Sequence, residues 1–307
     1  MTTGQSPFGR VVFASAICAT LLASSAQAAF QWSKRVASTT NDDFEPAIGM
    51  TLDTNGNSYV TGWFDGTNDF GGVILTNSSG GGQDIFVAKY NSTGALQWAR
   101  RAGGNSPSVP GIRDAGRDAG RGIGVDSAGN VYVAGGFFGT SDFGSFTLTA
   151  AGNRQFFLAK YDSAGTVQWV QQSTGGNGGN DGVYGTGLAV DAVGNSHAVG
   201  FAGNGAPITF GATNLSSPNS TSESTFLVKY DNSGTVKWAL LLSGSDEIYA
   251  TKVAVDAVGK FTARKASSTK NACRRRSVRL SPQIHPPSPF YFLSIVVMQS
   301  RVQNLNP

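Results

Sequence analysis

The sequence predicts an all-β protein built from repeated four-stranded antiparallel sheets. One phrase occurs three times at similar spacing, as KYNSTGALQWA (89–99), KYDSAGTVQWV (160–170) and KYDNSGTVKWA (229–239). Apolar and polar residues alternate around these turns, as they do in strands that bury one face. No window of residues 29–259 shows the periodicity of a helix. These observations favour hairpins over helices throughout the region.

The repeats extend over most of the chain, and such self-similarity indicates a repeat architecture. Full units cover about residues 47–104, 118–176 and 181–244, and a partial unit covers 246–259. We refer to them as the first to the fourth repeat. In each repeat an equivalent aspartate opens the first turn, and successive ones are 73, 65 and 65 residues apart: Asp53, Asp126, Asp191 and Asp256.

Each repeat is predicted to contain two hairpins. In the second repeat the expected strands are GIGVD (122–126), NVYVAGGF (130–137), FFLAKYD (156–162) and TVQWVQQ (166–172). Aspartate or asparagine opens each turn because its side chain can bond the local backbone, and the glycine supplies a positive φ.

A four-stranded sheet of this kind has two apolar faces and cannot bury both by itself. Radial repetition of sheets, which is the β-propeller architecture, is therefore the predicted fold. One tryptophan at a fixed point of each unit is predicted to fill the space between neighbouring sheets: Trp32, Trp98, Trp169 and Trp238. The segment FQWSKRV (30–36) is a shortened copy of a last strand, and we expect it to act as a latch that completes a final blade.

Three motifs carry a resemblance to a known family. They are D-x-x-G-N-x-Y-V-x-G (126–135), G-T-x-D-F-G (139–144 and 66–71) and F-L-A-K-Y-D-x-x-G-x-x-x-W (157–169). The chain resembles the seven-bladed β-propeller (SBBP) repeat family of secreted and cell-surface bacterial proteins. That resemblance implies an extracellular propeller of undefined ligand.

The chain departs from the family pattern in three respects. In the third repeat, GNGAPITFG (203–211) lacks the aspartate of the D-F-G motif. His197 stands where the first two repeats have Tyr59 and Tyr132. Three full units and two partial ones are too few for a ring of seven. We therefore expect an incomplete or open propeller whose edge strands are free for self-association.

The first 28 residues are predicted to be a secretory signal peptide. Arg10 precedes an apolar run (11–23), and Ala26-Gln27-Ala28 forms a small-x-small cleavage pattern. The run is shorter than the roughly 20 residues of a membrane helix. The sequence thus predicts an exported protein, either secreted or held at the cell surface, without a membrane span.

The segment 260–307 differs from the repeats in composition. It holds 9 of the 23 Lys and Arg residues and no acidic residue, whereas 29–259 has 13 basic against 19 acidic residues, a net charge of −6. Because the basic character is confined to the tail, nucleic acid is not a predicted partner. The repeat motifs end near residue 259, and we interpret 260–307 as disordered, poorly packed or the product of a shifted reading frame.

The sequence predicts no catalytic, cofactor or metal site. Residues 29–259 contain no cysteine, and the chain has only two histidines, so zinc sites and nucleophilic triads lack their residues. His197 is interpreted as a packed structural residue. Asp65, Asp69 and Asp142 are expected in an inter-strand loop, where stabilisation of a turn is favoured over Ca²⁺ binding.

Four aspartates are candidates for a ligand-binding face. Each lies 8–10 residues before the turn aspartate of its repeat, in a connection between units: Asp43, Asp118, Asp181 and Asp246. Symmetry would place them on one face, where a ring of carboxylates would bind a cation or a basic ligand. The alternative is that each bonds neighbouring loop amides.

The leading hypothesis is an exported, non-enzymatic β-propeller that serves as a binding or structural module, with an extracellular protein or glycan as partner and no cofactor. One alternative is a calcium-dependent binder of glycans or polymers. Another is a fragment of a quinoprotein-like enzyme, since such blades share the D-x-x-G-x-x-x-W pattern of Asp162 to Trp169.

Overall fold

Most of the repeat region is described by a computed structural model. The described residues are 37–38, 47–78, 82–105, 118–176, 182–203, 207–216, 224–242, 249–256, 261–266, 278–279 and 294–295. All of them belong to one unit, Ser33–Pro307. The predicted signal peptide, the segment 30–36 and Trp32 lie outside them, as does most of 260–307.

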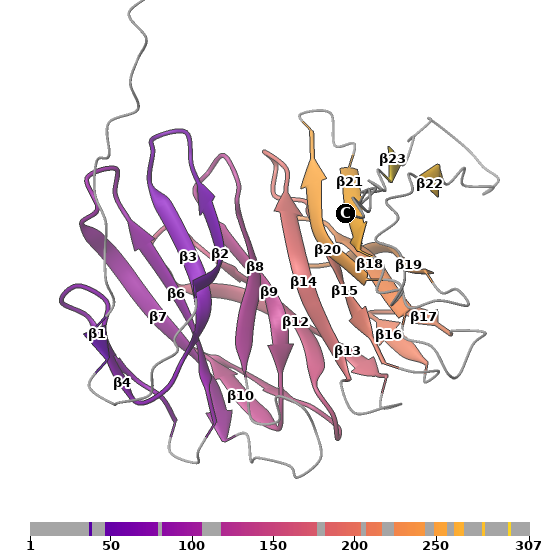
Figure 1. Ribbon diagram of the computed structural model, residues 1–307, viewed down its shortest axis with the longest axis horizontal. Helices are drawn as coiled ribbons and strands as arrows, with labels where there is room; N and C mark the ends of the chain where they lie inside the picture. Colours follow the sequence, from indigo (N-terminus) through magenta and orange to yellow (C-terminus); the bar gives the residue numbers. More distant parts are fainter. Residues whose placement is uncertain are drawn as a thin grey trace, which may run out of the picture. The chain divides into compact units, whose positions relative to one another are not determined.

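The described chain is all-β and its strand pairs are antiparallel, which confirms the predicted class (Figure 1). None of the described sheets closes on itself. The first repeat forms β2 (Ala47–Leu52), β3 (Ser58–Phe64), β6 (Asp84–Tyr90) and β7 (Leu96–Asn105). The second repeat forms β8 (Ala119–Val125), β9 (Val131–Phe137), β12 (Gln155–Tyr161) and β13 (Val167–Gly175).

The later repeats follow the same order. The third repeat forms β14 (Val183–Val190), β15 (Ser196–Ala202), β18 (Ser224–Tyr230) and β19 (Val236–Leu242). The fourth repeat contributes β20 (Tyr249–Val255) and β21 (Phe261–Ala266). We call these the first to fourth strands of each repeat.

Each full repeat also contains a third, short hairpin at a place where the sequence predicts a loop. It lies between the second and third strands, as β4 (Thr67–Asp69) with β5 (Ile74–Thr76), β10 (Thr140–Phe143) with β11 (Phe146–Thr149), and β16 (Ile208–Phe210) with β17 (Thr213–Leu215). Strands of three or four residues are too short to show an alternating pattern, so sequence periodicity does not predict them.

The short hairpins join one repeat to the repeat before it. Strand β10 pairs with β7 of the first repeat, and β16 pairs with β13 of the second. Two six-stranded sheets result, in the orders β11-β10-β7-β6-β3-β2 and β17-β16-β13-β12-β9-β8. Each hairpin therefore ties its own repeat to the preceding sheet through backbone hydrogen bonds.

The short hairpin of the first repeat, β4–β5, also pairs with a preceding strand, β1 (Ala37–Ser38). Ala37 is paired with Asp69, just as Gly103 is paired with Asp142 of the same motif. Ala37 and Gly103 each follow a repeat tryptophan by five residues. Strand β1 thus occupies the position of a fourth strand that would precede the first repeat.

A shift of register recurs in the hairpin that the first and second strands of every repeat form. The register between first and second strands shifts at Ala47/Gly49, Gly120/Gly122, Gly185/Gly187 and Ala250/Lys252. The pairing of β20 with β21 keeps this pattern as far as Ala266, beyond the last sequence motif at about residue 259. The remaining strands, β22 (Val278–Arg279) and β23 (Ser294–Ile295), pair with each other.

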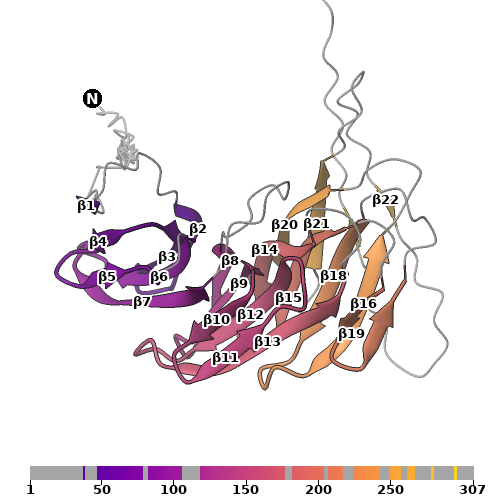
Figure 2. The same cartoon turned by 90° about the horizontal axis from the view of Figure 1, so that it is seen from below.

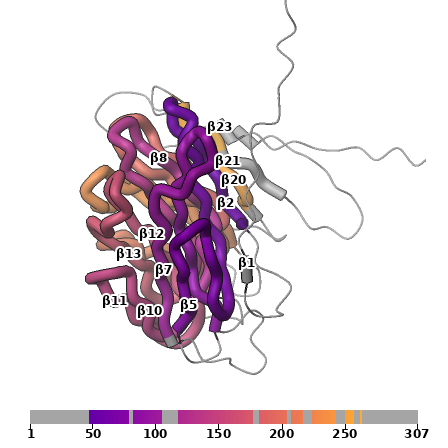
Figure 3. The backbone as a smooth tube through the Cα atoms, turned by 90° about the vertical axis from the view of Figure 1, so that its left-hand side faces the viewer, coloured from indigo at the N-terminus to yellow at the C-terminus, as the bar shows by residue number. Residues whose placement is uncertain are grey.

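The first strands of consecutive repeats lie side by side, β2 beside β8, β8 beside β14, and β14 beside β20 (Figure 1). Figure 3 shows the chain from the side of the first repeat. The sheets follow one another in the order of the repeats (Figure 2), and each apolar core is shared by two consecutive repeats. One core combines Tyr59 and Val87 of the first repeat with Val133 and Phe157 of the second. The next combines residues of the second and third repeats in the same manner. Burial between repeats therefore replaces a single central core.

The repeat tryptophans that the structure describes lie in or against these cores: Trp98, Trp169 and Trp238. The Trp98 indole donates a hydrogen bond from Nε1 to the carbonyl oxygen of Ser163 (3.0 Å), in the turn between third and fourth strands of the next repeat. Trp169 bonds the carbonyl oxygen of Asn232 in the same way (3.1 Å). The Trp98 ring covers Gly165, where an added Cβ would lie 2.8 Å from ring atom Cδ2. The glycine thus permits the indole to pack flat on the neighbouring turn.

Replacing Gly165 with alanine is expected to destabilise the protein for two reasons. The residue has a φ of +80°, which disfavours a side chain, and the new methyl group would collide with Trp98. Urea unfolding monitored by tryptophan fluorescence should show a lower free energy of unfolding.

Gly129→Ala is the matched control, because Gly129 also has a φ of +80° but an added Cβ would meet only Ser163, at 3.4 Å. We expect Gly165→Ala to cost about 1–3 kcal/mol more than Gly129→Ala, in line with the overpacking of a filled core. Equal losses would show that the indole contact contributes nothing.

Candidate functional site

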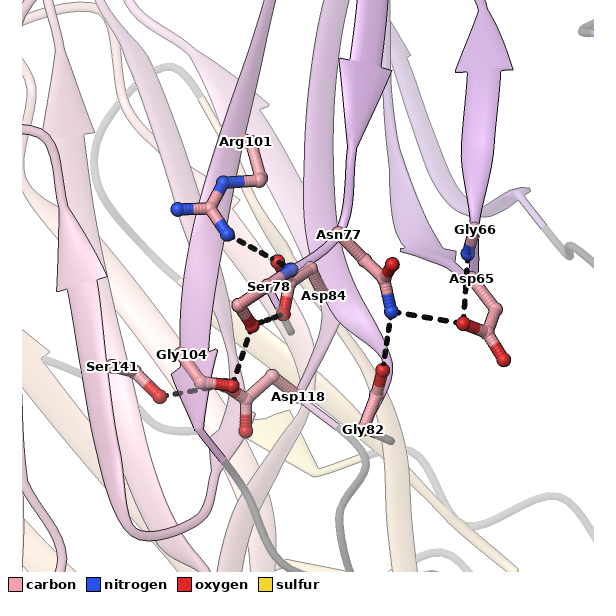
Figure 4. A network of polar contacts seen from close by, with 10 residues as sticks. All are labelled: Asp65, Gly66, Asn77, Ser78, Gly82, Asp84, Arg101, Gly104, Asp118 and Ser141. Carbon is pink, nitrogen blue, oxygen red and sulfur yellow. Dashed lines mark hydrogen bonds and ion pairs between the residues drawn. The ribbon is translucent and has the colours of Figure 1, made fainter. Parts of the chain in front are cut away.

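Of the four candidate aspartates, the structure describes Asp118. It directly precedes β8 and is fully buried. Its backbone N–H donates to the Gln83 carbonyl oxygen of the first repeat (3.0 Å). Its carboxylate accepts hydrogen bonds from the Phe138 backbone N–H (2.8 Å) and the Ser141 hydroxyl (2.6 Å; Figure 4). Both oxygens of this carboxylate are engaged within the protein.

The other three candidates, Asp43, Asp181 and Asp246, lie outside the described residues. The predicted ring of carboxylates therefore stays a prediction. At Asp118 the geometry matches the alternative, in which the carboxylate bonds neighbouring loop amides and hydroxyls.

A second buried carboxylate, Asp84 at the start of β6, organises a polar network that sequence reasoning missed (Figure 4). It is fully buried and accepts hydrogen bonds from Arg101 Nη1 (2.7 Å) and the Ser78 backbone N–H (2.8 Å). The Ser78 hydroxyl lies 2.9 Å from Asp84 Oδ1 and 2.6 Å from the Gly104 carbonyl oxygen, and donates to one of them at a time. Burial raises the pKa of Asp84, while the bonds from Ser78 and the charge of Arg101 act in the opposite direction.

The same network continues to the short hairpin β4–β5. Asn77 donates from Nδ2 to Asp65 Oδ1 and to the Gly82 carbonyl oxygen, both at 2.8 Å. Asp65 also accepts a bond from the backbone N–H of Gly66 (2.7 Å). These contacts hold the hairpin against the start of β6 (Figure 4).

The second repeat builds an equivalent junction from different residues. Gln155 stands at the position of Asp84; its Oε1 accepts from the Ser173 hydroxyl (2.9 Å) and its Nε2 donates to the Gly175 carbonyl oxygen (2.8 Å). The usable sequence signal is a polar residue directly before the apolar run of each third strand, at Asp84, Gln155 and Ser224. All three are buried.

Two arginines contact one aromatic ring between the second and third repeats. Arg154 is 2 % exposed, and its guanidinium lies 4.8 Å from the ring centres of both Phe138 and Tyr184. The Arg121 guanidinium lies 5.0 Å from the centre of the same Tyr184 ring. Tyr184 in turn stacks on Phe201, with ring centres 5.1 Å apart. Cation–π attraction of this kind stabilises the junction.

The acidic residues of the short hairpins stabilise their own turns. Asp69 Oδ1 accepts from the backbone N–H groups of Gly71 and Gly72 (2.8 and 2.7 Å). Asp142 Oδ1 accepts from the Thr147 hydroxyl (2.6 Å). In the described parts of the chain no group of three or more His, Cys, Asp or Glu residues is arranged to hold a metal ion.

His197 lies in β15 at the position of Tyr59 and Tyr132, and it is 2 % exposed. Its ring centre is 6.0 Å from that of Trp238. Burial, the largest cause, and the charge of Lys229 lower its pKa to about 4, while the charge of Asp191 acts in the opposite direction. The imidazole is therefore neutral at neutral pH and packed in the core.

A comparison of the sequence with models of protein families gives no match, and neither does a comparison with curated proteins. Among the described residues there is no helix of the length and apolar character that crossing a bilayer requires.

The free energy of unfolding is expected to decrease as the pH falls from about 6.5 towards 4. In this range the unfolded state binds a proton at His197 and the folded state does not, so protonation favours unfolding. Each unit of pKa difference corresponds to about 1.4 kcal/mol. The free energy of unfolding should accordingly drop by roughly 2–3 kcal/mol across the window.

His197→Tyr is the informative variant, because the first two repeats carry tyrosine at this position and bond it to the turn aspartate. Urea unfolding at a series of pH values should show a flatter profile for the variant between pH 4 and 6.5. Parallel profiles for the two proteins would contradict the assignment.

Proposed function

We propose that the sheets are blades of an open or incomplete β-propeller, as the resemblance to SBBP repeats implies. The side-by-side first strands β2, β8, β14 and β20 support this proposal, since a radial stack brings the innermost strands together. The recurrent bulge in each first hairpin supports it as well. Both features recur in every one of the four repeats.

We further propose that the protein is an exported, non-enzymatic module with a binding or structural role outside the cell. The observation that carries this proposal is that side-chain hydrogen bonds fasten each repeat to the next. Trp98 reaches Ser163, the Ser127 hydroxyl donates to the Ala192 carbonyl oxygen (2.7 Å), and Thr186 donates to the Ala250 carbonyl oxygen (2.5 Å). Contacts of this kind build a scaffold, and scaffolds present their connecting loops to partners.

The class of partner that suits an exported scaffold is an extracellular protein or glycan. The repeat region has a net charge of −6, which disfavours a polyanionic partner such as nucleic acid.

The purified mature chain should show no quinone absorption band in the visible spectrum, and its thermal unfolding midpoint should not change with calcium or a chelator. A quinone band would replace the proposal with an oxidoreductase, and a calcium-dependent midpoint would replace it with a calcium-dependent binder.

Export is expected to remove residues 1–28. When the full chain is produced in a bacterium with an intact secretion system, mass spectrometry of the exported protein should give an N-terminus at Ala29. Replacing both Ala26 and Ala28 with leucine should leave the uncleaved precursor, because the peptidase requires small side chains at these positions.

Ala23→Leu serves as the control, because it lies in the apolar run and preserves its character. This variant should be cleaved like the wild type. Recovery of the unmodified chain in the cytoplasm, with residues 1–28 present, would contradict export.

A further inference from the structure

Each full repeat carries a lysine in its third strand, paired with the aromatic residue of the second strand: Lys89 with Tyr59, Lys160 with Tyr132, and Lys229 with His197. The ammonium groups of Lys89 and Lys160 each lie 5.3 Å from the ring centre of the paired tyrosine. Lys160 is 9 % exposed, whereas the other two lysines are half-buried. The surroundings of Lys160 therefore differ from those of its equivalents.

The Lys160 ammonium group contacts the turn between β18 and β19 of the third repeat. Its Nζ donates hydrogen bonds to the side-chain Oδ1 of Asn232 and to the main-chain carbonyl oxygen of the same residue, the second at 3.3 Å. That carbonyl oxygen also accepts the bond from the Trp169 indole. A lysine and a primary amide that are 72 residues apart in the sequence are thus held in direct contact.

The Tyr132 hydroxyl lies at the same amide oxygen. It is 3.0 Å from Asn232 Oδ1 and 3.2 Å from Asp126 Oδ2, and donates to one of them at a time. Tyr132 is fully buried, and burial, together with the charge of Asp126, raises the pKa of its hydroxyl. The hydroxyl therefore stays protonated at neutral pH and serves as a donor to the amide.

Gly194 leaves the space in which this amide lies. A Cβ added there would be 2.4 Å from the Tyr132 hydroxyl oxygen and 3.0 Å from both Cγ and Oδ1 of Asn232. The amide oxygen is fixed by its two donors, whereas none of the described residues accepts a hydrogen bond from Nδ2, and Asn232 is exposed as a whole. The Nδ2 amino group is thus free to leave the site.

We propose that Lys160 and Asn232 join covalently, through an intramolecular amide bond between Lys160 Nζ and Asn232 Cγ. The lysine gives a proton to water, and its nitrogen then attacks Cγ, the carbon of the carbonyl group that it already contacts. The Tyr132 hydroxyl donates to Oδ1 while negative charge develops there.

The C–Nδ2 bond then breaks. Nδ2 takes a proton from the attacking nitrogen and leaves as ammonia, which takes up a further proton from water. One ammonium ion is therefore released for each amide formed, and no oxidant or reductant is needed. Contact between the two groups in the folded protein raises their effective concentration.

The other repeats each lack one of the three groups. Ser163 stands at the position of Asn232 opposite Lys89 and Tyr59, and a hydroxyl offers no carbonyl carbon. In the third repeat His197 replaces the tyrosine. The bond is therefore assigned to the junction between the second and third repeats alone. The proposal goes beyond the function above and does not depend on the extracellular partner.

The intact mass of the purified, denatured protein tests the proposal. It should be lower than the mass calculated for the observed N-terminus by one ammonia molecule. Because succinimide formation at an asparagine loses the same mass, digestion with trypsin locates the bond. Trypsin should not cut after Lys160, and the peptide 155–229 should be joined to the peptide 230–237.

Three variants accompany the wild type. Asn232→Ser copies the residue of the preceding repeat, and Lys160→Arg keeps the charge on a group that is not deprotonated; both should have the full calculated mass. Lys89→Arg is the matched control and should still lose one ammonia molecule.

Tyr132→Phe separates contact from chemistry, because it keeps the ring and removes the donor. This variant should form the bond more slowly, so that a smaller fraction is linked after purification and the fraction rises on incubation. Formation at the wild-type rate would overturn the role of Tyr132.

A wild-type protein of full calculated mass would overturn the proposal, and this result does not depend on the folding of any variant. A lowered mass with normal cleavage after Lys160 would also overturn it, as would a bond at Lys160 that persists in Asn232→Ser.

Discussion

The contact between consecutive sheets is the constraint on which the other features of the structure depend. Every residue of β9 is buried, because one face of the strand packs towards the first repeat through Val133 and the other towards the third repeat through Tyr132. A sheet that is apolar on both faces needs a neighbour on each side. Gly122 and Gly187 keep the first strands close enough for these faces to meet, and the Trp98 and Trp169 indoles close the same junctions at the turns.

The polar residues follow from this arrangement. Turns and strand ends carry backbone groups that burial between sheets removes from water, and such groups need partners. Asp118, Asp84 and Gln155 supply them where connections run between repeats. Of the four carboxylates that first suggest a ligand site, the structure describes Asp118, and both of its oxygens are engaged within the protein.

Some residues differ from their equivalents in the other repeats, in identity or in exposure, and they mark places where the environment of one repeat differs from that of the next. His197 replaces a tyrosine that bonds its turn aspartate in the first two repeats. Lys252 replaces a glycine at the close approach between first strands. Met50 and Leu52 keep the apolar character of their equivalents but remain exposed. Similar local sequence therefore produces different surfaces, because burial depends on the neighbouring sheet.

The sequence by itself determined the strands, the two main hairpins of each repeat and the turn chemistry, because alternation and Asp-x-x-Gly turns act over a few residues. It also located Trp98 and Trp169 at positions that recur. Only the tertiary structure decided that the short hairpin at 140–149 pairs with the preceding sheet, that Asp118 is buried, and that Asp84 and Arg101 meet. Those outcomes join residues from different strands or repeats, and contacts across a sheet junction depend on how the sheets pack, which no local pattern specifies.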